Sequence, residues 1–327
     1  MQVLVIIGIV IAALLGIIVL FVLTLVITHK IRLATEKSKI IPNGQLVKVN
    51  GNNMHVYIEG ENKDAPLLVF LSGSGTSAPV YDFKPLWSLL TDKYRIAVVE
   101  RLGYGYSDVA DSPRDTDTVL SETRAALHQL GEKGPYVLLP HSMSGLESLY
   151  WAKKYPHEVA GIIGIDMGLP EFYVSNEEMK TQVAKLKANL PFLRMGLHRL
   201  PSIQKANGIS PERYLSYLSP KEAEQLKLLF ISKLLNKAMI NELDPIFDNA
   251  KFVADAGVPD VPMLLLVATK PMPGSKQDMT AWVESQQAFA QKHNAKVQLF
   301  DTGHYLHHAE AEAMAAAIIE FIEDSIV

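Results

Sequence analysis

Ser142 follows an apolar run that predicts a strand, residues 136–139, and precedes a segment that predicts a helix, residues 146–152. A strand that turns sharply into a helix at a serine places the hydroxyl on a tight, exposed bend, with the free N–H groups of the helix N-terminus behind it. A serine hydroxyl attacks poorly unless a base removes its proton, so this nucleophile would need an imidazole within hydrogen-bond reach. We predict that Ser142 is the nucleophile of an enzyme.

The composition argues against several other kinds of functional site. The chain of 327 residues has no cysteine, which excludes thiol nucleophiles, disulfides and cysteine-bound metals. Its ten histidines include no HExxH pair, so we predict no metal site. The net charge is −4 and no basic stripe carries interleaved aromatic residues, so we predict no nucleic-acid partner.

The N-terminus, residues 1–29, contains no Lys, Arg, Asp or Glu. Its apolar residues 3–27 would form a helix of roughly 37 Å, enough to cross a hydrocarbon core of about 30 Å. We predict a single transmembrane anchor whose partner is membrane lipid. A cleaved signal peptide is the alternative, although its apolar region usually has only about 7–15 residues and follows a charged segment.

Basic residues after the predicted span indicate its orientation. Only the α-amino group precedes the span, so the positive-inside rule places the C-terminal body in the cytoplasm. The bias is small, and an extracellular body remains the alternative. The basic residues are Lys30, Arg32, Lys37 and Lys39.

Residues 30–44 read as a polar tether, and residues 45–327 read as one domain. The domain begins with two strand-like runs, residues 46–49 and 54–58, on either side of an Asn-Gly pair. This pattern predicts an antiparallel hairpin at the edge of a sheet.

The rest of the domain alternates strands with helices. Helical segments are predicted over residues 80–90 and 116–130, between continuous apolar runs typical of strands buried on both faces. This alternation predicts an α/β fold with a mostly parallel, doubly wound sheet. The apolar runs are residues 66–71, 95–99, 136–139, 160–166, 263–267 and 296–300.

The strand pattern is interrupted over about residues 167–259. This segment reads as helices, and Ser175 and Ser219 each begin a sequence that fits a capping box. Because strands resume after it, we predict an inserted helical lid over the site and favour this over a separate helical domain.

Four segments follow predicted strands in a characteristic order: Ser72-Gly73-Ser74-Gly75, residues 100–108, His141-Ser142-Met143 and Gly303-His304. Together they resemble the α/β-hydrolase superfamily, in its serine hydrolase or esterase-like branch. The resemblance runs from about residue 45 to the C-terminus, with little contribution from the lid. It departs at Pro140 and Ser144, which occupy the glycine positions of the nucleophile motif, and at Glu100, which replaces Asp.

The resemblance implies a role for each residue around Ser142. His304, in the loop after the last strand, would be the general base and then the general acid. The backbone N–H groups of Met143 and Ser74 would form the oxyanion hole. Ser142 could instead only cap the helix that follows it, since serine is a common N-cap.

The acid that would orient His304 has two candidates. Asp166 ends the sixth predicted strand, a position that some branches of the superfamily use. The loop after the seventh strand, the usual position, has no carboxylate before Asp278. Both satisfy the chain order Ser, Asp, His. We favour Asp166 and keep Asp278 as the alternative; Asp166 could also be a turn residue that binds local amides.

These features predict a serine hydrolase that cleaves an acyl ester, like a carboxylesterase or lipase, through an acyl-enzyme. Its substrate would be a small molecule with an apolar acyl group, and no cofactor is expected. Branches with an aspartate nucleophile are disfavoured because the motif carries serine. The alternative is a catalytically weak ligand-binding or scaffolding protein at the membrane. We assign no chemistry to three further histidines, interpreted as surface or helix residues: His128, His307 and His308.

Overall fold

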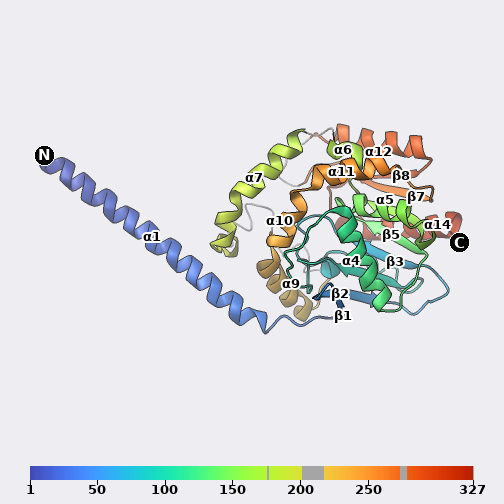
Figure 1. Cartoon of the computed structure of the whole chain (residues 1–327), viewed down its shortest axis with the longest axis horizontal. Coiled ribbons are helices and arrows are strands. Elements are labelled where there is room, and N and C mark those ends of the chain that lie inside the picture. Colours follow the sequence, from blue (N-terminus) through green and yellow to red (C-terminus); the bar gives the residue numbers. More distant parts are fainter. Residues whose placement is uncertain (175–176, 201–216, 273–277, 327) are drawn as a thin grey trace.

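The computed structural model describes residues 1–174, 177–200, 217–272 and 278–326. Its centre is one sheet of eight strands (Figure 1). The strands are β1 (Gln45–Val49), β2 (Asn52–Glu59), β3 (Leu67–Leu71), β4 (Ile96–Glu100), β5 (Tyr136–Pro140), β6 (Val159–Ile165), β7 (Met263–Ala268) and β8 (Lys296–Phe300).

The strand order is β1-β2-β4-β3-β5-β6-β7-β8. Neighbouring strands from β3 to β8 pair in parallel. β1 and β2 form an antiparallel hairpin, in which β2 pairs with β4 at the edge of the parallel part. Asn50 and Gly51 both have positive φ, 50° and 81°, as a two-residue hairpin turn of the primed type requires. The predicted edge hairpin and mostly parallel sheet are confirmed.

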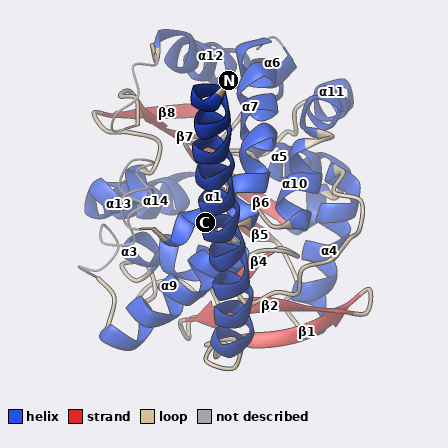
Figure 2. Ribbon diagram, turned by 90° about the vertical axis from the view of Figure 1, so that its left-hand side faces the viewer, coloured by secondary structure: helices blue, strands red, loops and turns tan. Residues whose placement is uncertain are grey.

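Helices cover both faces of the sheet (Figure 2). The helices of the described residues are α1 (Gln2–Lys37), which runs away from the sheet, and α2 (Pro79–Asp82), α3 (Lys84–Trp87), α4 (Thr116–Gln129), α5 (Ser144–Lys154), α6 (Pro170–Val174), α7 (Glu177–Arg194), α9 (Pro220–Lys233), α10 (Lys237–Leu243), α11 (Ile246–Ala256), α12 (Thr280–His293), α13 (Leu306–Ala309) and α14 (Ala311–Ser325), with short 3₁₀ turns at η1 (Pro156–Glu158) and η2 (Leu197–Arg199).

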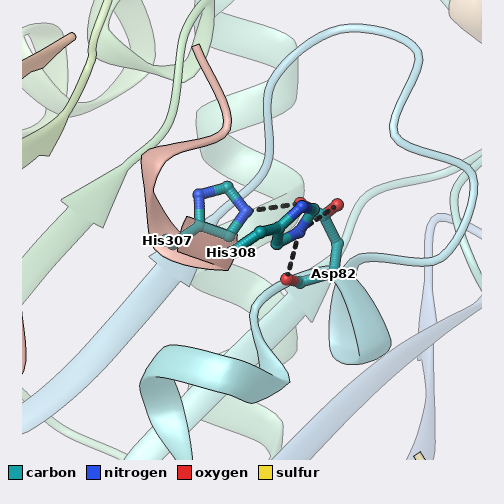
Figure 3. A group of neighbouring side chains, drawn as sticks. All are labelled: Asp82, His307 and His308. Carbon is teal, nitrogen blue, oxygen red and sulfur yellow. Dashed lines mark hydrogen bonds and ion pairs between the residues drawn. The ribbon is translucent and has the colours of Figure 1, made fainter. Parts of the chain in front are cut away.

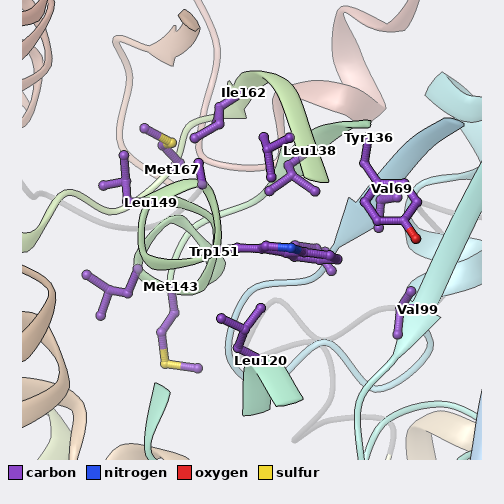
Figure 4. Close-up of a cluster of buried hydrophobic side chains, with 14 of the residues drawn as sticks. Val69, Val99, Leu120, Tyr136, Leu138, Met143, Leu149, Trp151, Ile162 and Met167 are labelled. Carbon is purple, nitrogen blue, oxygen red and sulfur yellow. The ribbon is translucent and has the colours of Figure 1, made fainter. Parts of the chain in front are cut away.

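Two hydrophobic cores lie on opposite faces of the sheet. One joins the sheet to α4, α5, α11 and α12, and the other joins it to α2, α3, α13 and α14. In the first core, the fully buried Trp151 of α5 packs edge-on against Tyr136 of β5, with ring centroids 5.5 Å apart (Figure 4). Burial on both faces explains why the central strands are continuous apolar runs.

Two predicted elements differ from the structure. The helix expected over residues 80–90 is broken into α2 and α3, because Pro85 has no N–H and its ring clashes with the preceding turn of a continuous helix. Residues 30–37, expected in the tether, continue α1 as a helix to Lys37.

The segment between β6 and β7 is helical, as predicted, and it contains α6, α7, η2, α9, α10 and α11. The capping box at Ser219 is confirmed: its hydroxyl accepts from the N–H of Glu222, whose carboxylate accepts from the N–H of Ser219. The predicted capping box at Ser175 lies outside the described residues.

Candidate active site

The bend between β5 and α5 holds Ser142 in a left-handed conformation, with φ of 53°. Non-glycine residues rarely adopt this conformation, and where they do the strain often marks a functional site. The N–H of His141 donates to the carbonyl of Leu71 in β3 at 2.9 Å, so the neighbouring strand fixes the start of the bend. The hydroxyl of Ser142 is thereby presented above the end of the sheet.

The residues around the bend are small because other segments approach closely. A Cβ on Gly73 would lie 2.7 Å from the Cβ of Ser142, so only glycine lets the segment after β3 pass here. Ser144 replaces a glycine of the family motif, and its hydroxyl oxygen lies 2.7 Å from the carbonyl oxygen of Leu71 and 2.8 Å from that of His141, the two acceptors for its one proton. This departure from the motif therefore adds a hydrogen bond to the bend.

His304 lies in the loop between β8 and α13, and its Nδ1 is 2.6 Å from Oδ2 of Asp166. A carboxylate can only accept, so Nδ1 carries the proton and Nε2 is left as the basic nitrogen. Asp166 follows β6 directly, has a fully buried side chain and adopts φ of 45°. Its Oδ1 accepts from the indole N–H of Trp282 at 2.8 Å and from the N–H of Ala268 at 3.0 Å. These three donors stabilise the buried carboxylate and fix its orientation.

Asp278 lies apart from this contact. Its carboxylate is exposed and accepts from the N–H of Thr280 at 2.9 Å and from the Thr280 hydroxyl at 2.7 Å, at the start of α12. These hydrogen bonds lower the pKa of Asp278. Of the two candidate acids, the structure brings Asp166 to His304.

The two predicted oxyanion donors flank the bend. Met143 precedes the first turn of α5, and Ser74 lies in the segment after β3. Among the described residues, no backbone hydrogen bond uses the N–H of Met143 or of Ser74. Both groups therefore remain available to bind an oxyanion.

A buried arginine supports the segment that carries Ser74. Nη2 of Arg101 donates to the carbonyl of Ser72 at 2.7 Å. On the other side, the N–H of Gly75 donates to the hydroxyl of Tyr104 at 3.3 Å. Arg101 and Tyr104 belong to the 100–108 loop, so this part of the family resemblance has a structural role here.

Glu100, which replaces Asp in that loop, also acts in the scaffold. Its carboxylate accepts from the N–H of Val80 at 3.1 Å and of Tyr106 at 2.7 Å, and it lies 2.9 Å from Nδ1 of His55.

A cavity of about 170 Å³ opens at Ser142. Asp166 and His304 line it together with Ser142, which places the three predicted catalytic side chains at one cavity. The remaining walls are mostly apolar, and methionine makes such walls adaptable in shape. They are formed by Phe172, Tyr173, Met179, Lys270, Met272, Met279 and Trp282.

Two residues of this site were not predicted from the sequence. Tyr173 and Trp282 are aromatic residues and belong to no motif that would single them out. His141, part of the nucleophile motif, supports the site. It is buried, and its Nε2 lies 3.1 Å from the carbonyl oxygen of His304. Burial holds the pKa of His141 well below its usual range, so the neutral ring donates this bond.

His307 and His308, interpreted from the sequence as surface or helix residues, lie in helix α13, where His307 is buried and both rings contact Asp82. Nε2 of His307 lies 3.0 Å from Oδ2 of Asp82, and Nε2 of His308 lies 3.0 Å from the Asp82 carbonyl and 3.2 Å from Oδ1 (Figure 3). The ligand atoms of the three residues lie within 4.8 Å of one another, a spacing that a metal ion could use. Burial lowers the pKa of His307 to about 4, so the neutral ring can donate directly to Asp82.

The fold agrees with the comparisons with known proteins. A family model described as "Alpha/beta hydrolase family" matches residues 68–317. The chain belongs to this alpha/beta hydrolase family. It is 38% identical over 262 residues to the uncharacterized protein YbdG of Bacillus subtilis (strain 168), covering 80% of this chain and 79% of YbdG. A 2-(acetamidomethylene)succinate hydrolase of Mesorhizobium japonicum is 27% identical over 128 residues, 39% of this chain and 44% of that protein.

Solved structures of other proteins have the same fold. A crystal structure of E-2-(acetamidomethylene)succinate hydrolase superposes with a TM-score of 0.60 at 18% identity, covering 85% of this chain and 98% of that one. Haloalkane dehalogenase DbeA from Bradyrhizobium elkani gives 0.56 at 18% identity, covering 85% and 97%. At this identity the likeness shows the fold alone, and the chemistry depends on the residues of this chain.

Proposed function

We propose that this alpha/beta hydrolase cleaves acyl esters through a Ser142 acyl-enzyme, with His304 and Asp166 completing the catalytic machinery. The observation that supports this most strongly is the 2.6 Å contact between Nδ1 of His304 and Asp166, at a cavity that Ser142 also lines. It supplies an oriented base where the bend presents a hydroxyl.

The reaction follows from these positions. Nε2 of His304 takes the proton of Ser142 as Oγ attacks the acyl carbon, and the N–H groups of Met143 and Ser74 stabilise the oxyanion. His304 then gives the proton to the leaving oxygen as the ester C–O bond breaks. A water activated by the same nitrogen hydrolyses the acyl-enzyme, and Asp166 keeps His304 in the required tautomer throughout.

The cavity favours a small apolar acyl group. Its volume of about 170 Å³ is below the ~300 Å³ at which sites for drug-sized ligands begin. Its three methionines and three large aromatic side chains give an acyl chain apolar contacts, while no buried cation faces it from the described residues. We therefore propose short-chain esters as substrates.

Two departures from the family pattern favour the alternative, a catalytically weak binding protein: the missing acid after the seventh strand and Pro140. The contact between Asp166 and His304 weighs against the first reason. Pro140 sits at the last position of β5, and the ladder continues through the N–H of His141, which weighs against the second.

Hydrolysis of p-nitrophenyl esters of increasing acyl length by the full chain in detergent tests the proposal. Ser142→Ala and Asp166→Asn should each lower kcat by at least ~10³-fold, because the residues of a triad act as a unit. Ser121→Ala, on the exposed face of α4, and Asp278→Asn are the matched controls and should stay within ~2-fold, as for surface substitutions. Full activity in Ser142→Ala, or equal losses in both aspartate variants, would contradict the assignment.

A further inference from the structure

The lid is fixed to the end of α1 at two places. Arg199 of η2 donates to both carboxylate oxygens of Glu36, at 2.9 and 2.6 Å, and to Nδ1 of His29 at 2.8 Å. In α9, the side-chain oxygen of Gln225 accepts from the N–H of Ile41, just beyond α1, at 2.9 Å. The apolar helix therefore has a defined position relative to the lid.

Helix α7 of the lid lies where the apolar part of α1 ends. The apolar run stops at residue 27, shortly before His29, and none of the residues in its most apolar stretch is buried against the body. Helix α7 ends shortly before Arg199, which binds His29. In Figure 1 it runs across the direction of α1, on the side of the body that faces the N-terminal end of α1. With α1 across a bilayer, α7 therefore lies along the bilayer surface.

The outer face of α7 is exposed and partly apolar. Phe192, in the last turn, has 53% of its surface exposed. The exposed positions recur at intervals of three or four residues, so they lie on one side of the helix. The opposite side faces the body, and Met179 on that side lines the cavity at Ser142. We define the outer face by its exposed residues: Lys180, Thr181, Ala184, Lys185, Ala188 and Phe192.

The charge of this segment has one sign. Residues 179–199 contain five Lys or Arg and no Asp or Glu. Lys187 and Arg199 form ion pairs with acids of other elements, and Lys180 and Lys185 are exposed on the outer face. Helices that lie on membranes combine these features, because their apolar side chains enter the interface and their cations meet anionic headgroups.

We propose that the outer face of α7 binds the surface of a bilayer that contains anionic phospholipids. This continues the contact that α1 makes with lipid, so it rests on the predicted insertion of α1 and is independent of the esterase chemistry. Phe192 lies at the boundary of headgroups and acyl chains, about 5–10 Å deep, and Lys185 meets lipid phosphates. Because Met179 of the same helix lines the cavity at Ser142, the contact holds this cavity close to the lipid.

The lack of cysteine allows a site-specific test in the full chain. Ala188→Cys is labelled with a fluorophore and reconstituted into vesicles of phosphatidylcholine and phosphatidylglycerol, with or without a lipid that carries a quencher at the headgroup boundary. The quencher should reduce the fluorescence at least ~2-fold, because the label lies in the interface. Ser121→Cys, at an exposed position of α4 away from α7 (Figure 1), is the control and should not be quenched.

Charge reversal tests which lipid is bound. In the labelled Ala188→Cys chain, Lys185→Glu should weaken the quenching at least ~2-fold, because each cation near the surface adds to the attraction of anionic lipid. Lys133→Glu is the matched control. Lys133 is exposed and precedes β5, at the end of the sheet opposite Ser142, so its reversal should leave the quenching unchanged.

Several results would overturn the proposal. They are the absence of quenching at position 188, equal quenching in vesicles of phosphatidylcholine alone, and equal quenching in Lys185→Glu. Flotation of the same vesicles shows whether α1 is inserted, and a chain that does not float with them would overturn the insertion on which the proposal rests. All substituted positions are exposed, so each variant should keep the wild-type thermal midpoint.

Discussion

Asp82 and His307 make the stability of the fold depend on pH. Burial lowers the pKa of His307 from 6.5 to about 4. Between these values the unfolded chain binds a proton that the folded chain does not. Stability therefore falls as the pH drops below 6.5, by about 1.4 kcal/mol per pH unit. The pKa of Asp82 is held well below its usual range by its two imidazole partners despite burial, so its own contribution is lost only at lower pH.

We predict that His307→Gln, which keeps a donor for Asp82, makes the thermal midpoint depend less on pH between 7 and 5. The residual slope comes from other buried groups, including His141, whose pKa is also lowered. Thermal unfolding of the full chain at several pH values measures this. His128→Gln, at an exposed position of α4, is the control and should keep the wild-type slope. An unchanged slope in His307→Gln would show that His307 is not the titrating group.

Most of the candidate site could be predicted from residue types and their positions after predicted strands. Ser142 and His304 could be selected because each follows a predicted strand in a recognisable motif. Asp166 and Asp278 could not be separated, because both fit the chain order and only the packing of β6 beside β7 decides which reaches His304. Tyr173 could not be selected, because its place in the cavity wall depends on how the chain turns after β6.

Helix α10 of the lid contacts the two residues, Arg101 and Tyr104, that hold the segment around Ser74 in place. Glu242, buried in α10, accepts from the hydroxyl of Tyr104 at 2.5 Å, and the same hydroxyl accepts from the N–H of Gly75. Its carboxylate also lies 3.8 Å from Arg101 and 3.6 Å from Arg114. One lid carboxylate thus holds the tyrosine and the arginine that position the backbone around Ser74.

We predict that Glu242→Gln lowers kcat roughly 10-fold, because an amide leaves two buried guanidinium groups with less compensating charge and loosens the oxyanion segment. KM should change less, since Glu242 does not line the cavity at Ser142. Steady-state kinetics with a p-nitrophenyl ester measures both constants. Glu224→Gln, at an exposed position of α9, is the matched control. A rise in KM with kcat unchanged would contradict this role and mean that Glu242 acts on substrate binding.

Most elements could be predicted because strands buried on both faces read as continuous apolar runs. The strands β3 to β7 have only buried residues except Ala160, and each was found within a few residues. The break between α2 and α3 was missed, although Pro85 marks it. The arrangement of the lid helices was not predicted, because their packing partners lie far away in sequence.

At the scale of the whole molecule, α1 runs away from the hydrolase body (Figure 1). It is the one helix among the described residues that is long and apolar enough to cross a membrane, with a mean hydropathy of 3.4 over its most apolar 18 residues. Its last turns contact the lid: Arg199 of η2 donates to both carboxylate oxygens of Glu36, at 2.9 and 2.6 Å, and to Nδ1 of His29 at 2.8 Å. The lid is thus fixed to the end of the apolar helix.

We predict that α1 is an uncleaved anchor and that the body faces the cytoplasm. The full chain should stay in the membrane pellet after alkaline carbonate extraction and keep its N-terminal residues by mass spectrometry. A soluble product that has lost those residues would identify α1 as a signal peptide. Protease added to intact cells should leave a cytoplasmic body uncut. Digestion of the body would show that it faces the outside of the cell and would contradict the predicted orientation.

The central claim is that Ser142 is an activated nucleophile, and covalent labelling tests it most directly. The full chain in detergent is treated with a fluorophosphonate, and its peptides are analysed by mass spectrometry. We predict one phosphonyl adduct, on Ser142, with fluoride as the leaving group. Ser142→Ala should not be labelled, whereas Ser121→Ala should be labelled as the wild type is. An unlabelled wild type, or equal labelling of Ser142→Ala, would contradict the account.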